Sequence, residues 1–222
     1  MTLGARLGTI EVERQDKLKS FFTDRIDIEL GRLREELDRC GTRDRERIDS
    51  VIRFARQQDY GPRTRDRHYM AHAVRVARYL AIWMSKVDSA PIIAALLHNG
   101  IEKGITTEAG LAKDFGIWVS SAIRHLTVDR TLMAGERGRN EYYRCLSKAP
   151  VEVQAIKIFD KFDNLLSLCV NPDAAVRERY LSEAQQYVLP MAEISMPDFS
   201  SYFSALIDDD YRVGHLKVAS SA

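Results

Sequence analysis

Apolar residues recur along this chain at the three- and four-residue spacing that places them on one face of an α-helix, whereas strict alternation over the length of a β-strand is scarce. The clearest case lies between Thr23 and Cys40, where charged residues separate a stripe that consists of Ile26, Leu30, Leu33 and Leu37. Gly41 follows as a stop signal. The stripe predicts an amphipathic helix, and the pattern of the whole chain predicts an all-α protein.

The same spacing predicts helices in the rest of the chain. They cover about residues 44–57, 68–84, 91–99, 107–115, 117–126, 140–147, 150–168, 173–189 and 197–208. The helix that starts at Pro91 is apolar on nearly every side, so we expect it at the centre of the bundle. Two segments interrupt the pattern and are predicted to be loops. They are DYGPRTRDR at 59–67 and DRTLMAGERGRN at 129–140, of which the second, with two glycines, is predicted to be a mobile surface loop.

Composition narrows the class of protein. The chain has 222 residues, enough for one well-filled domain or one domain with a small appendage, and its 29% charged and 45% hydrophobic residues are ordinary for a globular protein. The formal net charge of +1 gives no global field that would require nucleic acid or an acidic membrane as a partner. We therefore expect neither partner, and any anion site must be local.

The cysteines and the apolar runs bear on the cellular location. Cys40, Cys145 and Cys169 are far apart and odd in number, so they suggest neither a disulfide framework nor a zinc ribbon, and a reducing compartment fits best. No stretch has the apolar length of a membrane span, and the start of the chain lacks the apolar core of a secretory signal. The expectation is a soluble cytoplasmic protein.

Polar residues on buried helix faces are the candidates for chemistry, because burying an unpaired polar group costs free energy. His72 and Asp160 both fall on apolar stripes of their predicted helices. His98 and Asn99 end the most apolar helix, and Glu102 lies one turn beyond His98. Two inward histidines and an inward carboxylate on three helices can satisfy one another by converging on a cation, and such ligands suit Mn²⁺, Fe²⁺ or Zn²⁺ better than Mg²⁺ or Ca²⁺.

Each of these residues also has an ordinary structural interpretation. An inward histidine is more often a satisfied core residue than a ligand. Asp160 could cap a neighbouring helix or pair with an arginine, and Glu102 could be solvated. Spacing alone leaves the metal site and the structural interpretation open.

Four stretches of the sequence, taken together, resemble the HD phosphohydrolase superfamily and, within it, the RelA/SpoT-homologue alarmone hydrolases, including the small single-domain type. RTRDRHYMAH resembles the family segment R-x-x-x-x-x-Y-x-x-H, and AALLHNGIEKG resembles AALLHD-x-x-ED. FGIWVSSAIRHLT resembles the helix that follows, and IKIFDKFDNLLSL resembles KLADRLHN-x-x-TL. The stretches cover about residues 50–170.

The resemblance implies a fold and an activity. The fold is an HD-domain helical bundle with an extra N-terminal helix, and we expect a helical extension over residues 1–45 and an HD-type hydrolase domain over residues 46–215. The implied activity is the Mn²⁺-dependent removal of the 3′-pyrophosphate from (p)ppGpp or a related alarmone, with Zn²⁺ or Fe²⁺ as alternative ions. The expected partner is thus a nucleotide.

The resemblance also implies roles for individual residues. His72, His98 and Asp160 would hold the metal, position 99 would supply the fourth protein ligand, and Glu102 would position or deprotonate the attacking water. The substrate-binding residues implied in the same way are Arg63, which would stack on the base, Lys161, which would face phosphates, and Asn164 and Ser167, which would line the nucleotide pocket. For Lys161 a solvated position remains open.

The sequence departs from the family pattern at two positions. Asn99 stands where the family has the aspartate of its HD motif, so an anionic ligand is missing and metal affinity should fall. Lys103 stands where the family has the aspartate of its ED pair, and it could shift the preference between guanosine and adenosine alarmones. Asn99 has two explanations that stay open: an introduced substitution that preserves shape and captures intact substrate, or a natural pseudoenzyme.

Three functions remain in competition. The first is the alarmone hydrolase, here an inactivated Asp-to-Asn form. The second is another HD phosphohydrolase that acts on nucleoside mono- or triphosphates, and the third is a non-catalytic nucleotide sensor or antitoxin-like binding protein. The stripe of the N-terminal helix could pack on its own domain or on a second copy, so a homodimer through this helix is a further expectation.

Overall fold

Every regular element is helical in the computed structural model of the chain, which describes residues 7–20, 23, 25–58, 69–84 and 86–216. The all-α prediction is confirmed for these residues. The predicted loop at 59–67 lies outside them. None of the helices described is both long and apolar enough to cross a bilayer.

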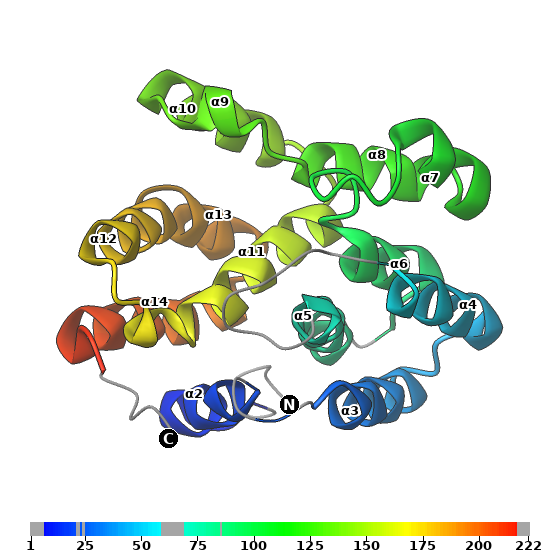
Figure 1. Cartoon of the computed structure of the whole chain (residues 1–222), viewed down its shortest axis with the longest axis horizontal. Coiled ribbons are helices and arrows are strands. Elements are labelled where there is room, and N and C mark those ends of the chain that lie inside the picture. The colour runs from blue at the N-terminus through cyan, green and yellow to red at the C-terminus, as the bar shows by residue number, and fades with distance from the viewer. Residues whose placement is uncertain (1–6, 21–22, 24, 59–68, 85, 217–222) are drawn as a thin grey trace.

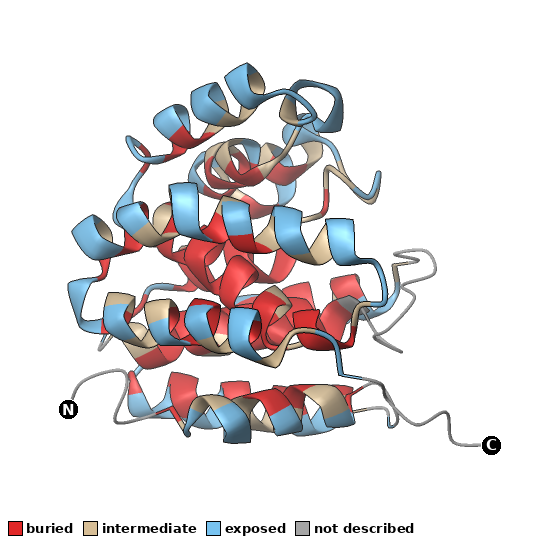
Figure 2. Ribbon diagram, turned by 90° about the vertical axis from the view of Figure 1, so that its left-hand side faces the viewer, coloured by how far each residue is buried: buried red, intermediate tan, exposed pale blue. Residues whose placement is uncertain are grey.

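Three helices form the centre of the molecule: α5 (Tyr69–Trp83), α6 (Ser89–Leu97) and α11 (Val151–Leu165). Figure 1 shows α11 running through the middle, and α5 packs against both α6 and α11. Buried residues concentrate where these helices meet, while the outer faces of the surrounding helices are exposed (Figure 2). The prediction that the apolar helix from Pro91 lies centrally is confirmed, because nearly all of α6 is buried.

Two helices from the N-terminal part cover one side of this centre. The leucine stripe predicted for the first of them lies on α3 (Ile26–Arg39), and all of its members are buried, with Leu33 fully so. α3 packs on α5, and α4 (Arg45–Arg56) packs on α6. The apolar stripe of α3 thus packs against another helix of the same chain. A homodimer through this helix stays a prediction, as does the division into residues 1–45 and 46–215.

The prediction of a mobile loop at 129–140 is wrong. The segment forms α9 (Arg130–Met133) and the first turns of α10 (Glu136–Leu146), which follow α7 (Glu108–Phe115) and α8 (Ile117–Leu126) along one edge of the molecule (Figure 1). The side chain of Asp129 caps α9 by accepting the backbone N–H groups of its first residues. Gly138 is needed because a Cβ there would overlap the backbone of Leu132, so this glycine marks close helix packing.

The C-terminal helices cover the other side of α11. The helix predicted at 173–189 is α12 (Ala174–Glu183), which continues through a π-helical turn at Ala184–Val188 into α13 (Leu189–Ser195). α14 (Pro197–Val213) follows, and α13 and α14 both contact α11. A 3₁₀ turn at Leu168–Val170 follows α11 along the chain.

Helix α2 (Ile10–Lys19) was not predicted, because the face that it packs on the domain is charged and gives no apolar periodicity. Its buried residues are Arg14 and Lys17. The guanidinium of Arg14 pairs with Asp209 and, at 2.5 Å, with Asp210, both on α14. Burial raises the pKa of Asp210 to about 7 although Arg14 opposes the shift, and the adjacent Asp209 adds to it.

The packing of α3 predicts the effect of truncating its stripe. Leu33→Ala should lower the free energy of unfolding by about 2 to 5 kcal/mol, because it removes fully buried apolar atoms and leaves a cavity that the neighbouring side chains fill only in part. Ile28→Ala on the same helix is the control, since Ile28 is half exposed, and it should cost no more than about 0.5 kcal/mol. Equal losses in urea denaturation would show that α3 does not pack as described.

The Asp210 pair predicts a pH dependence of stability. An unfolded aspartate loses its proton near pH 3.8 and the folded one near pH 7, so between these values the folded state binds more protons and the free energy of unfolding falls as pH rises. Asp210→Asn removes this contribution and keeps an acceptor for Arg14. The free energy of unfolding, taken from denaturation curves across that pH range, should therefore decline less with rising pH in the variant than in the unaltered chain. Identical pH dependence in the two proteins would refute the assignment.

Candidate metal centre

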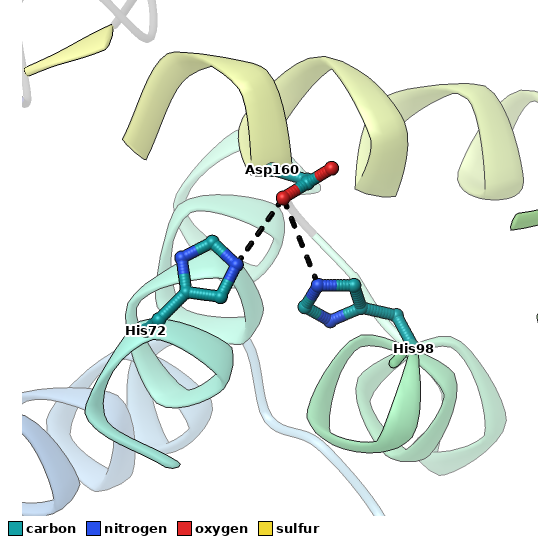
Figure 3. A group of neighbouring side chains, drawn as sticks. All are labelled: His72, His98 and Asp160. Atoms are coloured by element: carbon teal, nitrogen blue, oxygen red, sulfur yellow. Dashed lines mark ion pairs between the residues drawn. The ribbon is translucent and has the colours of Figure 1, made fainter. Parts of the chain in front are cut away.

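His72, His98 and Asp160 come together from three separate central helices. His72 lies on α5, His98 follows the last residue of α6, and Asp160 lies on α11. Figure 3 shows both imidazole rings turned toward the same carboxylate. The Nε2 atom of His72 lies 3.2 Å from Asp160 Oδ1 and the Nε2 atom of His98 lies 3.8 Å from it. One ligand atom from each residue falls within 4.8 Å of the other two.

The position of His98 follows from the helix before it. The apolar residues of α6 are buried on all sides, so the chain delivers His98 into the interior as the helix ends. Its Nδ1 lies 2.7 Å from the carbonyl oxygen of Ala95. A carbonyl can only accept, so Nδ1 carries the proton and Nε2 is the atom left to face Asp160.

His72 is held by a second carboxylate. Its Nδ1 lies 2.6 Å from Oδ2 of Asp163, which is fully buried on α11. Asp163 also accepts hydrogen bonds from Arg75 Nε at 2.7 Å and from Lys17 Nζ at 2.6 Å. Burial raises the pKa of Asp163, but Arg75 and Lys17 outweigh it and hold that pKa well below the usual range. A carboxylate behind a ligating histidine is the usual way to fix the ring and its tautomer.

Sequence reasoning did not identify Asp163. The available signal was a second acid, one turn after Asp160, in the apolar run IFDKFDNLL. Arg75 stands in the same relation to His72 on α5, three positions later. Lys17 could not have been found, because it belongs to the unpredicted helix α2.

Asp160 is kept ionised by its surroundings. Burial, the largest influence, raises its pKa, but Lys157 and the two histidines outweigh it and place the pKa well below the usual range. Lys157 Nζ lies 3.1 Å from Asp160 Oδ2. Asn164 donates its side-chain amide to Asp160 Oδ1 at 2.8 Å. Asn164 therefore supports Asp160 directly, a role that sequence reasoning did not assign to it.

Asn99 borders the cluster and contacts it through its amide nitrogen. Nδ2 of Asn99 lies 2.6 Å from Nε2 of His98, so the amide donates to the nitrogen that faces Asp160. Rotation of the amide by 180° would turn Oδ1 toward the same point and make Asn99 an uncharged ligand. The position fits a fourth ligand, and its chemistry is weaker than that of an aspartate.

Glu102 is half-buried and turned toward the segment between α8 and α9. Its Oε1 accepts the backbone N–H of Val128 at 2.9 Å, and Arg130 Nη2 lies 3.8 Å from its Oε2. This anchoring fixes the carboxylate at the end of α6 and its loop. Its role toward a water molecule stays a prediction. Lys103, beside it, is exposed.

Of the predicted substrate-binding residues, Lys161, Asn164 and Ser167 lie within the described part of the chain. Lys161 is buried, pairs with Glu183 at 2.8 Å and lies 4.6 Å from the ring centroid of Tyr180, so the alternative of a solvated position for Lys161 is wrong. Ser167 donates its hydroxyl to the carbonyl of Asn164 at 3.3 Å. Arg63 lies outside the described residues.

The donor set fits a divalent transition ion. Two imidazole nitrogens and one ionised carboxylate face a common point, and both histidines use their other nitrogen for a hydrogen bond that orients the ring. Asp163 orients the ring of His72 and the carbonyl of Ala95 orients the ring of His98, as hydrogen-bond partners of metal-binding histidines usually do.

Comparison with known proteins relates the chain to a group of hydrolases. No protein-family model matches it. Proteins named guanosine-3′,5′-bis(diphosphate) 3′-pyrophosphohydrolase MESH1 are similar to it: that of Drosophila melanogaster is 32% identical over 112 residues, 50% of this chain and 62% of the relative. That of Danio rerio is 31% identical over 124 residues, 53% of this chain and 67% of the relative. The human protein is 32% identical over 100 residues, 45% and 55% of the two chains.

A solved structure shares the fold. It is described as a metazoan ortholog of SpoT that hydrolyzes ppGpp and plays a role in starvation responses. The two structures superpose with a TM-score of 0.60 at 24% identity, over 74% of this chain and 93% of the other. The predicted fold, an HD-domain helical bundle, is confirmed by this likeness.

The chemistry of position 99 predicts a gain of metal affinity. Asn99→Asp should tighten Mn²⁺ binding, measured by isothermal titration calorimetry, by about 10-fold or more, because it adds an anionic ligand beside His98. Asn140→Asp, an equal charge change on the exposed face of α10, is the control and should leave the affinity unchanged. If both variants behave alike, residue 99 does not face the ion.

Proposed function

The chain belongs to the family of MESH1 guanosine-3′,5′-bis(diphosphate) 3′-pyrophosphohydrolases, in the HD-domain superfamily, and on that premise we propose that its site is built to remove the 3′-pyrophosphate from (p)ppGpp or the adenosine equivalent. The observation that carries the proposal is the convergence of His72, His98 and Asp160 on one point. We further propose that Asn99 leaves this chain weakly active or inactive. A nucleotide alarmone is then the substrate class.

We assign one group of residues to binding the ion and Glu102 to orienting the attacking water. When bound, a divalent ion such as Mn²⁺ lowers the pKa of the water bound to it and polarises a phosphoryl oxygen. His72, His98 and Asp160 would hold that ion, with Asn99 as a neutral fourth ligand. Zn²⁺ and Fe²⁺ suit the same donors. Glu102, fixed by the N–H of Val128, is the residue proposed to orient the attacking water.

Positive charge near Asp160 suits a pyrophosphate substrate. Lys157 lies against the carboxylate of Asp160 and Lys161 is buried beside it on the next position of α11. Lys157 would balance phosphate charge once the ion takes up the negative charge of Asp160, and Lys161, which pairs with Glu183, is proposed to face phosphates because of the family resemblance. Arg63 is proposed to stack on the base, and Asn164 and Ser167 to line the nucleotide pocket. These last roles rest on the family resemblance.

The site also supports a second function. The amide of Asn99 donates to His98 Nε2, the atom that would otherwise bind the ion, so the chain could hold a nucleotide without hydrolysing it. Such a protein would be a sensor or an antitoxin-like binding module. In either function we expect a protein of the cytoplasm that needs no nucleic acid and no membrane, and a homodimer through the N-terminal helix stays a proposal.

Restoring the carboxylate separates the functions. Asn99→Asp, with Mn²⁺ present, should release pyrophosphate from ppGpp or from its adenosine counterpart at a rate well above that of the unaltered chain, because a second anionic ligand joins Asp160. His98→Ala in the Asn99→Asp protein is the control and should abolish the release. The assay is pyrophosphate production with each nucleotide in turn.

The other outcomes of this assay are equally specific. Release of phosphate from nucleoside mono- or triphosphates, but not from the alarmones, would assign the chain to another HD phosphohydrolase. If the variant binds both Mn²⁺ and nucleotide but releases neither pyrophosphate nor phosphate from any of them, the hydrolase function is contradicted and the binding function is supported.

A further inference from the structure

The buried side chains by which helix α2 joins the domain are charged, whereas its apolar Ile10 packs against the core while only partly buried. Val12 is more than half exposed, whereas Arg14 is 2% and Lys17 is 3% exposed. Glu13 adds to the same contact, since it receives the hydroxyl of Tyr79 at 3.5 Å and lies 3.7 Å from Arg78. A helix that only covered the core would be expected to bury apolar residues.

The two buried cations of α2 reach different partners. Arg14 pairs with Asp209 and Asp210 near the end of α14. Lys17, one turn later, pairs with Asp163 on α11. Lys17 thus contacts the carboxylate that orients His72, whereas the ion pairs of Arg14 are with residues of α14.

The ammonium of Lys17 and the imidazole of His72 share one oxygen atom. Both Lys17 Nζ and His72 Nδ1 lie 2.6 Å from Oδ2 of Asp163, while Arg75 Nε lies 2.7 Å from Oδ1. Arg75 Nη2 also donates to Oδ2, at a longer 3.3 Å, so Lys17 is the close cationic partner of the oxygen that holds His72. Without Lys17, Oδ2 would keep His72 and only the longer contact with Arg75 Nη2, so the oxygen that orients the imidazole would be held less tightly.

Taking an ammonium and a carboxylate out of water carries a large desolvation cost, and apolar residues in their place are often equally stabilising. Stability alone therefore gives little reason for Lys17. Its cation does have a use at the metal centre: it keeps Asp163 an acceptor, and it stands beside an imidazole that must offer Nε2 as an unprotonated ligand.

We propose that Lys17 is a positioning residue of the metal centre, which acts through Asp163 on His72, so that the docking of α2 completes the site. The inference rests on the proposed function where it assigns an ion to His72. The orientation of the His72 ring by Lys17 is independent of that assignment. Helix α2 is then part of the hydrolase site and not an appendage to it.

The two buried cations of α2 provide a matched comparison. Lys17→Met removes the charge at similar length, Lys17→Arg restores it, and Arg14→Met removes the other buried cation of the same helix. Two quantities are measured: Mn²⁺ affinity by calorimetry, and the Nδ1–H resonance of His72 with its rate of exchange with water, by NMR of the metal-free protein. Neither readout requires turnover.

The proposal expects the Lys17 and Arg14 variants to differ. Lys17→Met should weaken Mn²⁺ binding by about 10-fold or more and expose the His72 Nδ1–H to exchange, and Lys17→Arg should recover both. Arg14→Met should lower stability yet leave both readouts unchanged. If Lys17→Met does not fold, Lys17→Gln, which removes the charge, takes its place and should weaken Mn²⁺ binding in the same direction.

Two results would overturn the proposal. One is an unchanged Mn²⁺ affinity and an unchanged His72 resonance in Lys17→Met. The other is an equal effect of Arg14→Met, which would make α2 a general support. If the unaltered chain and Asn99→Asp both fail to bind Mn²⁺, the proposed function fails, and the resonance in the metal-free protein still decides whether Lys17 positions His72.

Discussion

A fully buried negative charge, that of Asp163, sets the arrangement of three helices. A carboxylate without access to water must be paired on both oxygens, and here the partners come from α2 (Lys17) and α5 (Arg75 and His72), while Asp163 itself lies on α11. The same pairing turns the Nε2 atom of His72 toward Asp160. Charge compensation inside the bundle and the geometry of the candidate metal centre are therefore one constraint.

Much of the fold could be predicted because apolar spacing records which helix face is buried. The stripe of α3 and the all-round apolar character of α6 are buried as their patterns predict. The failures have physical causes. Helix α2 buries Arg14 and Lys17, which an apolar pattern cannot reveal, and Gly138 suggested a loop although it serves the close approach of α10 to the backbone of Leu132.

The candidate site could be predicted at its centre and not around it. His72, His98 and Asp160 stood out because polar residues interrupt apolar helix faces, and the structure brings them together. Asp163 and Lys17 escaped notice because their significance lies in contacts between helices distant in sequence, separated by 146 positions. The family resemblance supplied the role of Glu102 and the nucleotide-binding roles, which remain predictions.

The proposed metal centre requires two imidazoles and one carboxylate to bind a single ion. Crystals of the chain soaked in Mn²⁺ and measured at the manganese absorption edge test it most directly. We expect one strong anomalous peak about 2 Å from Nε2 of His72, from Nε2 of His98 and from a carboxylate oxygen of Asp160. A saturated crystal with its manganese elsewhere, or with these three side chains paired only with one another, would contradict it.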